Sequence, residues 1–252
     1  MKVYLASFDT IQLQYKKNIN NLFLLSSFWT YQNAKQPPEH VYKDSHLLDS
    51  GAFTAINDKT GKFKNFDWDL YLDKYIKFIK KTNQKKFFEL DIDCVVGLKK
   101  VEYYRKKMED AIGIAPIICW HLSRGKEYWI KCCEEYSYVA LGTTLASLAG
   151  QKIRKNPEIL NWFINYAHKN NAKIHGLGFT SIPWLHKLKF DSVDSTAWLA
   201  GTRYGTGACK FKSNTIIPPT KPLNAKMKKG GLLNIYNFEE WVKFQQYANN
   251  HL

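Results

Sequence analysis

Short apolar runs alternate with longer amphipathic segments along most of this chain. Apolar runs of strand length predict eight β-strands, at residues 2–8, 21–28, 46–53, 85–92, 115–121, 138–143, 173–179 and 190–196. Apolar residues at helical spacing predict helices at 67–82, 99–112, 125–136, 156–171 and 237–250. Asn156 followed by Pro157 is typical of a helix start, a capping side chain before proline at the first helical position.

Strands that alternate with helices predict a parallel sheet with helical crossovers. Eight strands favour a closed (β/α)8 barrel of the TIM type over an open doubly wound sheet. We expect one domain over residues 1–252, because barrels of this length commonly form a single unit. Residues 201–231 break the pattern, and their Gly, Pro and Lys content predicts a basic irregular segment before the last helix.

The charge balance of the chain points to a polyanionic partner. Lys and Arg number 37 against 22 Asp and Glu, a formal net charge of +15. Such a field concentrates polyanions, of which nucleic acid is the commonest. The alternative is a lysine-rich surface that only reflects the Asn-, Ile- and Lys-rich composition, and charge alone leaves both interpretations open.

Other classes of protein fit the composition less well. No apolar run approaches the roughly 20 residues that span a bilayer, and the first residues lack a secretory pattern, so we expect no membrane partner and a cytoplasmic location. The five cysteines form no CxxC pair, which argues against structural zinc and for reduced thiols. We therefore expect neither a metal nor a cofactor.

Acidic residues gather where the predicted strands end. Asp49, Asp91, Asp93 and Asp194 each close a strand, and active sites of parallel barrels are built at these ends. One such Asp is usually a cap or turn former, as we expect for Asp191, but several in so basic a chain favour a shared site. Clustered carboxylates can divide the work of attacking a sugar carbon, moving a proton and reading a base edge. This division predicts base exchange at a glycosidic bond.

Five short segments resemble motifs of one enzyme family. Residues 47–53, LLDSGAF, resemble a DSGG(F/Y) motif, and residues 190–196, FDSVDST, resemble a VDxFDC strand. Weaker similarities are ELDIDC at 89–94, ALGTT at 140–144 and IHGLGF at 174–179. In this order they resemble the queuine and archaeosine tRNA-guanine transglycosylases, and their phage relatives that place 7-deazaguanines in DNA. The resemblance covers residues 46 to 205.

The resemblance implies roles for individual residues. Asp194 would be the nucleophile that forms a covalent glycosyl intermediate, and Asp49 the general acid and base. Other residues would bind the exchanged base: Phe53 and His175 stacking on its two faces, Asp91 or Asp93 reading the guanine edge, and Gly142 and Gly176 giving main-chain contacts. His121 stands where the tRNA enzymes have glutamine, so it is either a donor to the base edge or a structural histidine.

One departure from the family bears on the substrate. The tRNA enzymes carry a C-terminal CxCxxC…H zinc subdomain, which this chain lacks, and this favours duplex DNA with a flipped guanine and a preQ0-type incoming base. Phosphate contacts are expected from the basic segment, at Arg203, Lys210, Lys212, Lys226, Lys228 and Lys229, unless that segment is only a solvated loop. The alternatives are a tRNA-guanine transglycosylase without the zinc subdomain and a catalytically silent protein that binds nucleic acid or deazaguanine.

Overall fold

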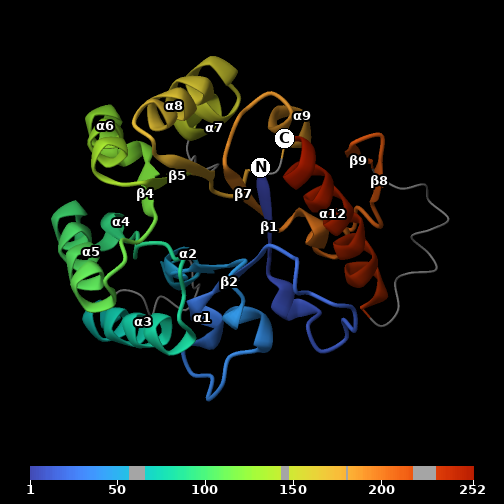
Figure 1. Ribbon diagram of the computed structural model, residues 1–252, viewed down its shortest axis with the longest axis horizontal. Coiled ribbons are helices and arrows are strands. Elements are labelled where there is room, and N and C mark those ends of the chain that lie inside the picture. The colour runs from blue at the N-terminus through green and yellow to red at the C-terminus, as the bar shows by residue number, and fades with distance from the viewer. Residues whose placement is uncertain (57–65, 143–147, 180, 218–230) are drawn as a thin grey trace.

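Seven parallel strands form a curled sheet with helices around its outer side (Figure 1). The computed structural model describes residues 1–56, 66–142, 148–179, 181–217 and 231–252. The strand order is β3-β2-β1-β7-β6-β5-β4. These strands are β1 (Lys2–Ala6), β2 (Leu24–Ser27), β3 (His46–Asp49), β4 (Ile118–His121), β5 (Tyr138–Gly142), β6 (Lys173–Gly176) and β7 (Ser192–Ser195).

The long helices occupy the positions that the periodicity predicts. They are α3 (Trp68–Thr82), α5 (Leu98–Ile112), α6 (Gly125–Glu135), α8 (Pro157–Lys169) and α12 (Leu232–His251). The Asn156 side chain accepts hydrogen bonds from the N–H groups of Glu158 and Ile159, which confirms the predicted start of α8. The periodicity did not predict the short helices α1 (Phe28–Tyr31), α2 (Ala52–Ile56), α4 (Asp93–Val96), α7 (Leu148–Arg154), α9 (Ile182–Leu185) and α10 (Ala200–Arg203).

Residues 85–92 depart from the predicted pattern. Only Phe87 and Phe88 pair in this fully described segment, through isolated parallel bridges to Leu48 of β3 and Ile117 beside β4. The backbone then turns, with the Ile92 N–H donating to the Leu90 carbonyl instead of to a neighbouring strand. The expected strand is therefore reduced to two bridges between the outer strands of the sheet.

Strand β3 is shorter than expected because of a close approach at Gly51. The Gly51 backbone has φ of 80°, a left-handed conformation that favours glycine. A Cβ on Gly51 would lie 2.6 Å from the Trp29 Cβ. The chain therefore leaves the ladder after Asp49 and enters α2 at Ala52. This early end leaves Asp49 as the last strand residue.

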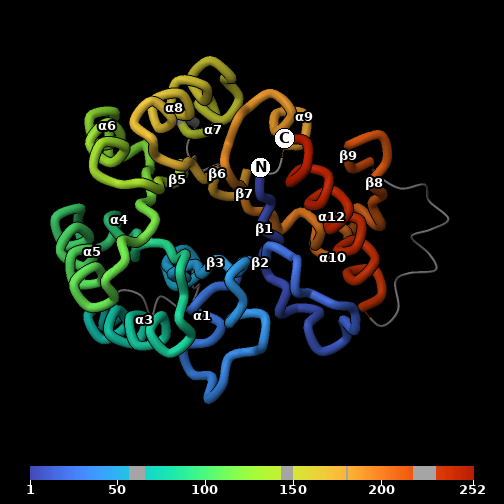
Figure 2. Tube along the Cα trace, viewed as in Figure 1, coloured from blue at the N-terminus to red at the C-terminus, as the bar shows by residue number. Residues whose placement is uncertain are grey.

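The predicted basic segment, residues 201–231, is partly regular. Strands β8 (Lys210–Lys212) and β9 (Thr215–Ile217) form an antiparallel hairpin, turning at Ser213 and Asn214 with positive φ. Residues 218–230 lie outside the described part. Helix α12 lies beside β1, where the N-terminal ammonium donates to the Ala248 carbonyl at 3.2 Å, so both chain ends lie together (Figure 2). No helix of the described residues is long and apolar enough to cross a membrane.

Side chains alternate between the two faces of the curled sheet. Val3 and Leu5 of β1 join the large cluster that includes α12 residues, whereas Tyr4 and Ala6 join a smaller cluster. That smaller cluster lines the inside of the curl, with Leu25, Leu47, Phe88, Ile117, Cys119 and Ala140. Side chains of a strand alternate between its two faces. The residues that lie two positions further along each strand, at its carboxyl end, therefore also face the inside of the curl.

Candidate functional site

The inward positions at the strand ends carry polar side chains. Asp49 comes two residues after Leu47, His121 two after Cys119, and Gly142 two after Ala140. Asp194 lies opposite Tyr4 in the β1–β7 register, on the same inward face. Pleating and parallel register thus bring residues from four strands to one end of the curl.

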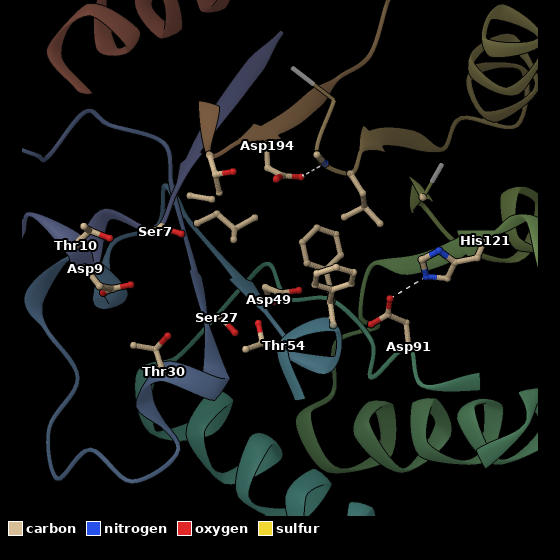
Figure 3. A pocket seen from close by; sticks show the side chains of 18 residues that line it. Ser7, Asp9, Thr10, Ser27, Thr30, Asp49, Thr54, Asp91, His121 and Asp194 are labelled. Atoms are coloured by element: carbon tan, nitrogen blue, oxygen red, sulfur yellow. Dashed lines mark hydrogen bonds and ion pairs between the residues drawn. The ribbon is translucent and has the colours of Figure 1, made fainter. Parts of the chain in front are cut away.

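These residues surround a cavity of about 760 Å³. Asp49, Asp91, His121, Gly142 and Asp194 all line it, so the structure brings together the carboxylates of the predicted site (Figure 3). The volume falls within the range of small-molecule sites, roughly 300 to 1,000 Å³. The roles assigned to the residues remain predictions.

Asp49 has the environment of a proton carrier. Its Oδ2 accepts a hydrogen bond from the Gly51 N–H at 3.0 Å. Burial and the carboxylates of Asp91 and Asp194 raise the pKa of Asp49 to about 7, against the effect of the Gly51 N–H. A carboxyl group with a pKa near neutrality can both donate and accept a proton at physiological pH.

Two hydrogen-bond donors contact one oxygen of the Asp194 carboxylate. The Gly178 N–H donates to Asp194 Oδ1 at 2.6 Å, and His175 Nε2 lies 3.2 Å from the same oxygen. Gly178 has φ of 57°, and its carbonyl accepts a hydrogen bond from Arg154, whose guanidinium also lies 4.9 Å from the Phe179 ring centre. Gly178 is therefore fixed against the strand that carries Asp194.

His175 and Gly176 do not have the positions that the resemblance implies. The His175 ring is fully buried behind Asp194, with the Phe88 ring 5.2 Å away, and it does not line the cavity. A Cβ on Gly176 would lie 3.1 Å from Phe179 and 3.2 Å from Phe190, so this glycine serves side-chain packing. Neither residue lines the cavity, so the structure gives no support to a stacking role for His175 or a main-chain contact from Gly176. Phe88 presents a ring to the cavity and Gly178 its backbone.

Asp91 and His121 form a pair on one wall of the cavity. His121 Nε2 lies 2.9 Å from Asp91 Oδ2, and Ser50 Oγ donates to Asp91 Oδ1 at 3.4 Å. Burial acts to lower the pKa of His121, but the bond to Asp91 outweighs it and the pKa is raised. Its Nδ1 is buried on the side of Gly142 and has no hydrogen-bond partner among the described residues.

Gly142 lines the cavity and also makes room for His121. A Cβ at this position would lie 2.5 Å from His121 Nδ1 and 2.6 Å from its Cε1. Any larger residue would displace the ring, because such a distance is far below van der Waals contact. The glycine is required by the neighbouring histidine, whatever its backbone contributes to a ligand.

Asp93 belongs to a buried ionic network and does not line the cavity. Arg124 donates to Asp93 Oδ1 at 2.8 Å and to Glu89 Oε1 at 2.6 Å, and Arg105 donates to Glu89 Oε2 at 2.7 Å. Burial acts to raise the pKa of Asp93, but the bond to Arg124 lowers it overall. Of the two candidates for reading the base edge, Asp91 is the one at the cavity.

Phe53, the other expected stacking residue, lies at the rim. It belongs to α2, lines the cavity and is 75% exposed. Phe88 lines the same cavity from a buried position, with 1% of its surface exposed. The cavity therefore has one accessible aromatic ring and one fixed ring.

The opposite wall carries hydroxyl groups and a further carboxylate that the sequence pattern did not indicate. Figure 3 shows Ser7, Asp9, Thr10 and Thr30 across the cavity from Asp91 and His121. Asp9 Oδ1 is buried without a hydrogen-bond partner among the described residues, and His40 Nε2 lies 3.5 Å from it. Asp9 directly follows the predicted strand 2–8, so the strand-end rule could have indicated it, although the structure ends β1 at Ala6.

The basic residues expected to bind phosphates are only partly described. Lys210 and Lys212 extend from β8 and Arg203 ends α10, and all three side chains are exposed. None of the three lines the cavity. Lys226, Lys228 and Lys229 lie outside the described residues.

No model of a known protein family matches the chain, and no curated protein matches it. The site offers a carboxylate held by two donors, a second carboxyl group with a pKa near 7, and a carboxylate–imidazole pair that can read a polar edge. These are the parts needed to break and remake a glycosidic bond.

Proposed function

We propose that the protein is a transglycosylase that exchanges guanine in DNA for a 7-deazaguanine of the preQ0 type. The observation that carries the proposal is that Asp49 and Asp194, from strands far apart in the sequence, line one cavity in different environments. The order of the five motif-like segments supports the same chemistry. The proposal includes a closed eight-stranded barrel, in which residues 87–88 supply the eighth strand through their bridges to Leu48 and Ile117.

The reaction would proceed by double displacement. An oxygen of Asp194 attacks C1′ of the target nucleotide, the bond from C1′ to N9 breaks, and guanine leaves with a proton from neutral Asp49. The incoming base then returns a proton to Asp49 and attacks C1′, which releases Asp194. A pKa of about 7 suits Asp49 to both proton transfers.

Base recognition would fall to the wall that carries Asp91 and His121. A carboxylate accepts hydrogen bonds from adjacent N–H groups, such as those on the guanine edge, and an imidazole N–H can donate to a carbonyl oxygen. The His121 Nδ1 lacks a partner among the described residues but faces Gly142, so the ring would have to turn toward the base to donate. Phe53 and Phe88 supply the apolar faces for the ring.

The decisive test is to look for the product. Cells that express the protein together with the preQ0 pathway are compared with cells that express Asp194→Asn, and digested DNA and tRNA are analysed by mass spectrometry. We expect a 7-deazaguanine nucleoside in DNA with the wild type only. Modified tRNA with unmodified DNA would favour the second candidate, and no modified nucleoside in either would favour a binding protein without activity.

The second candidate is the same exchange on RNA. The observation that favours it is Asp9, a carboxylate that lines the cavity opposite Asp91 (Figure 3) and whose Oδ1 lies 3.5 Å from His40 Nε2. A carboxylate oxygen can accept a hydrogen bond from a 2′-hydroxyl group, which RNA has and DNA lacks. Comparing Asp9→Asn with wild type on matched RNA and DNA oligonucleotides tests this. A loss on RNA with an unchanged rate on DNA would support it, and unchanged rates on both substrates would contradict it.

A further inference from the structure

A chain of hydrogen bonds runs from Asp194 into the interior of the curled sheet. His175 Nε2 lies 3.2 Å from Asp194 Oδ1, and His175 Nδ1 lies 2.6 Å from Ser192 Oγ. Ser192 Oγ in turn lies 2.5 Å from the hydroxyl oxygen of Tyr138. The four residues come from the neighbouring strands β7, β6 and β5, and we call Tyr138, Ser192 and His175 the relay.

We propose that the relay and the Gly178 N–H fix Asp194 Oδ1, so that Oδ2 is the atom that attacks the sugar. His175 is then a positioning residue that acts through Asp194, and Ser192 and Tyr138 hold it in the required tautomer. This inference rests on the proposed transglycosylase function and deepens it.

The direction of the relay follows from its two ends. Burial raises the pKa of Tyr138 to about 12, so its hydroxyl group stays protonated and can donate to Ser192. Ser192 then donates its own proton to His175 Nδ1, which leaves the Nε2–H to donate to Asp194. For a neutral imidazole, the reverse direction would place the lone pair of Nε2 against the Asp194 carboxylate, which is repulsive.

Holding Oδ1 has a chemical consequence for the covalent step. When the bond between Oδ2 and C1′ forms and guanine leaves, the carboxylate becomes an ester whose carbonyl oxygen is Oδ1. Negative charge returns to this group when the incoming base displaces it. Two donors already aimed at Oδ1 stabilise the returning charge, so they favour breakdown of the ester more than its formation.

A purely structural role explains the relay less well. Polar groups inside a protein lose their hydration. A buried hydrogen-bonded pair therefore adds little more to the stability of the fold than apolar side chains of the same shape. His175 is fully buried and Ser192 is 1% exposed, yet both are polar, and their chain ends on the candidate nucleophile. The Tyr4 ring also packs on His175, at 6.1 Å between ring centres, and provides a matched control outside the relay.

The experiment measures the two half-reactions separately. Wild type, His175→Leu, Tyr138→Phe and the control Tyr4→Phe are mixed with a guanine-containing oligonucleotide. The covalent adduct is quantified by denaturing electrophoresis, first without and then with added preQ0. We expect adduct breakdown to slow by roughly 10²-fold in His175→Leu and by roughly threefold to tenfold in Tyr138→Phe, with smaller effects on adduct formation.

The trapped fraction of adduct at steady state should therefore rise in both relay variants and stay at the wild-type value in Tyr4→Phe. A structural defect would slow both half-reactions together and leave this fraction unchanged. If His175→Leu does not fold, Tyr138→Phe decides alone. If Tyr138→Phe keeps the wild-type fraction of trapped adduct and still exchanges the base, the inference about the relay is overturned and the proposed function stands. If the wild-type protein forms no adduct on DNA or RNA, the proposed function is overturned as well.

Discussion

On the β4 side of the cavity, carboxylates are held by cations, whereas on the β6–β7 side Asp194 is held by neutral donors. Asp93 and Glu89 pair with Arg124, and Asp91 pairs with His121, whose pKa is raised. Asp194 instead receives the Gly178 N–H and the ring of His175. The two sides differ in what remains available to a ligand.

A carboxylate paired with a cation is fixed in place and keeps its acceptor geometry, which suits recognition. A carboxylate held at one oxygen by neutral donors keeps more of its negative charge, which suits attack on carbon. Asp49 has a raised pKa and carries a proton near neutral pH. Carboxylates around one cavity thus acquire different properties from the residues that contact them.

The largest expected effect is on the side with neutral donors. Asp194→Asn should reduce base exchange by about 10⁴-fold, because an amide cannot attack C1′, while the fold survives. Asp191→Asn, three residues earlier, is the control and should retain activity. Exchange rates on an oligonucleotide and circular dichroism check both variants. Activity of Asp194→Asn above one-hundredth of wild type would show that Asp194 is not the nucleophile.

The next largest effect is on the stability of the ionic side. Glu89→Gln should lower the free energy of unfolding by about 3–5 kcal/mol, because it removes the charge that compensates buried Arg105 and Arg124. Urea denaturation measures the change. Glu102→Gln breaks the exposed pair with Lys131 and should cost less than about 1 kcal/mol. Similar small losses in both variants would contradict the contrast between the two sides.

Asp49→Asn should separate activity from stability. Because the folded-state pKa is raised above 3.8 to about 7, Asp49 contributes stability that is full below pH 4 and is lost as the pH rises toward 7. The variant should therefore be more stable than wild type at pH 8, by at most roughly 4 kcal/mol, and similar at pH 4. Thermal or urea unfolding across this range measures it.

Exchange by the same Asp49→Asn variant should fall by roughly 10²–10⁴-fold, because the proton carrier is removed. A stability difference that stays constant between pH 4 and pH 8 would show that Asp49 is not the group whose pKa is raised.

The smallest expected effect concerns phosphate binding. Replacing Lys210 and Lys212 of β8 by alanine should reduce the slope of log affinity against log salt by up to about 2, roughly 0.9 for each phosphate that is no longer neutralised. The matched control replaces Lys80 and Lys81 at the end of α3, on a different part of the molecule (Figure 1). Fluorescence anisotropy with labelled duplex measures the slopes. Equal slopes in both variants would show that the β8 lysines are solvated and do not contact phosphates.

Sequence reasoning predicts those parts of the fold and site that depend on local pattern. The parallel strands, the long helices and the gathering of Asp49, Asp91 and Asp194 follow from period and from the strand-end rule. Exact strand ends did not follow, because they depend on tertiary contacts such as that between Gly51 and Trp29. The choice between Asp91 and Asp93 depends on such an end, and Asp9 lies beyond the end of β1 in a short 3-10 turn.

The residues that hold the site residues in place could not be predicted in the same way. His175 was expected to face the ligand, but only the pairing of β6 with β7 shows that its ring is covered by Phe88 and bonded to Ser192. Glu89, Arg105 and Arg124 come from three separate segments, and nothing in their spacing indicates that they meet. Long-range pairs of this kind are visible only in three dimensions.

The pairing of β1 with β7 has a consequence for how activity is acquired during folding. Tyr4 lies opposite Asp194, so the strand that carries Asp194 is set in place by residues from the other end of the chain. Contacts of such large sequence separation form late, because loop closure must precede them. Until then β1 has an unpaired edge, which is prone to pairing with other chains. Recovery of activity after refolding should therefore lag behind recovery of helical structure, and aggregation should compete during that interval.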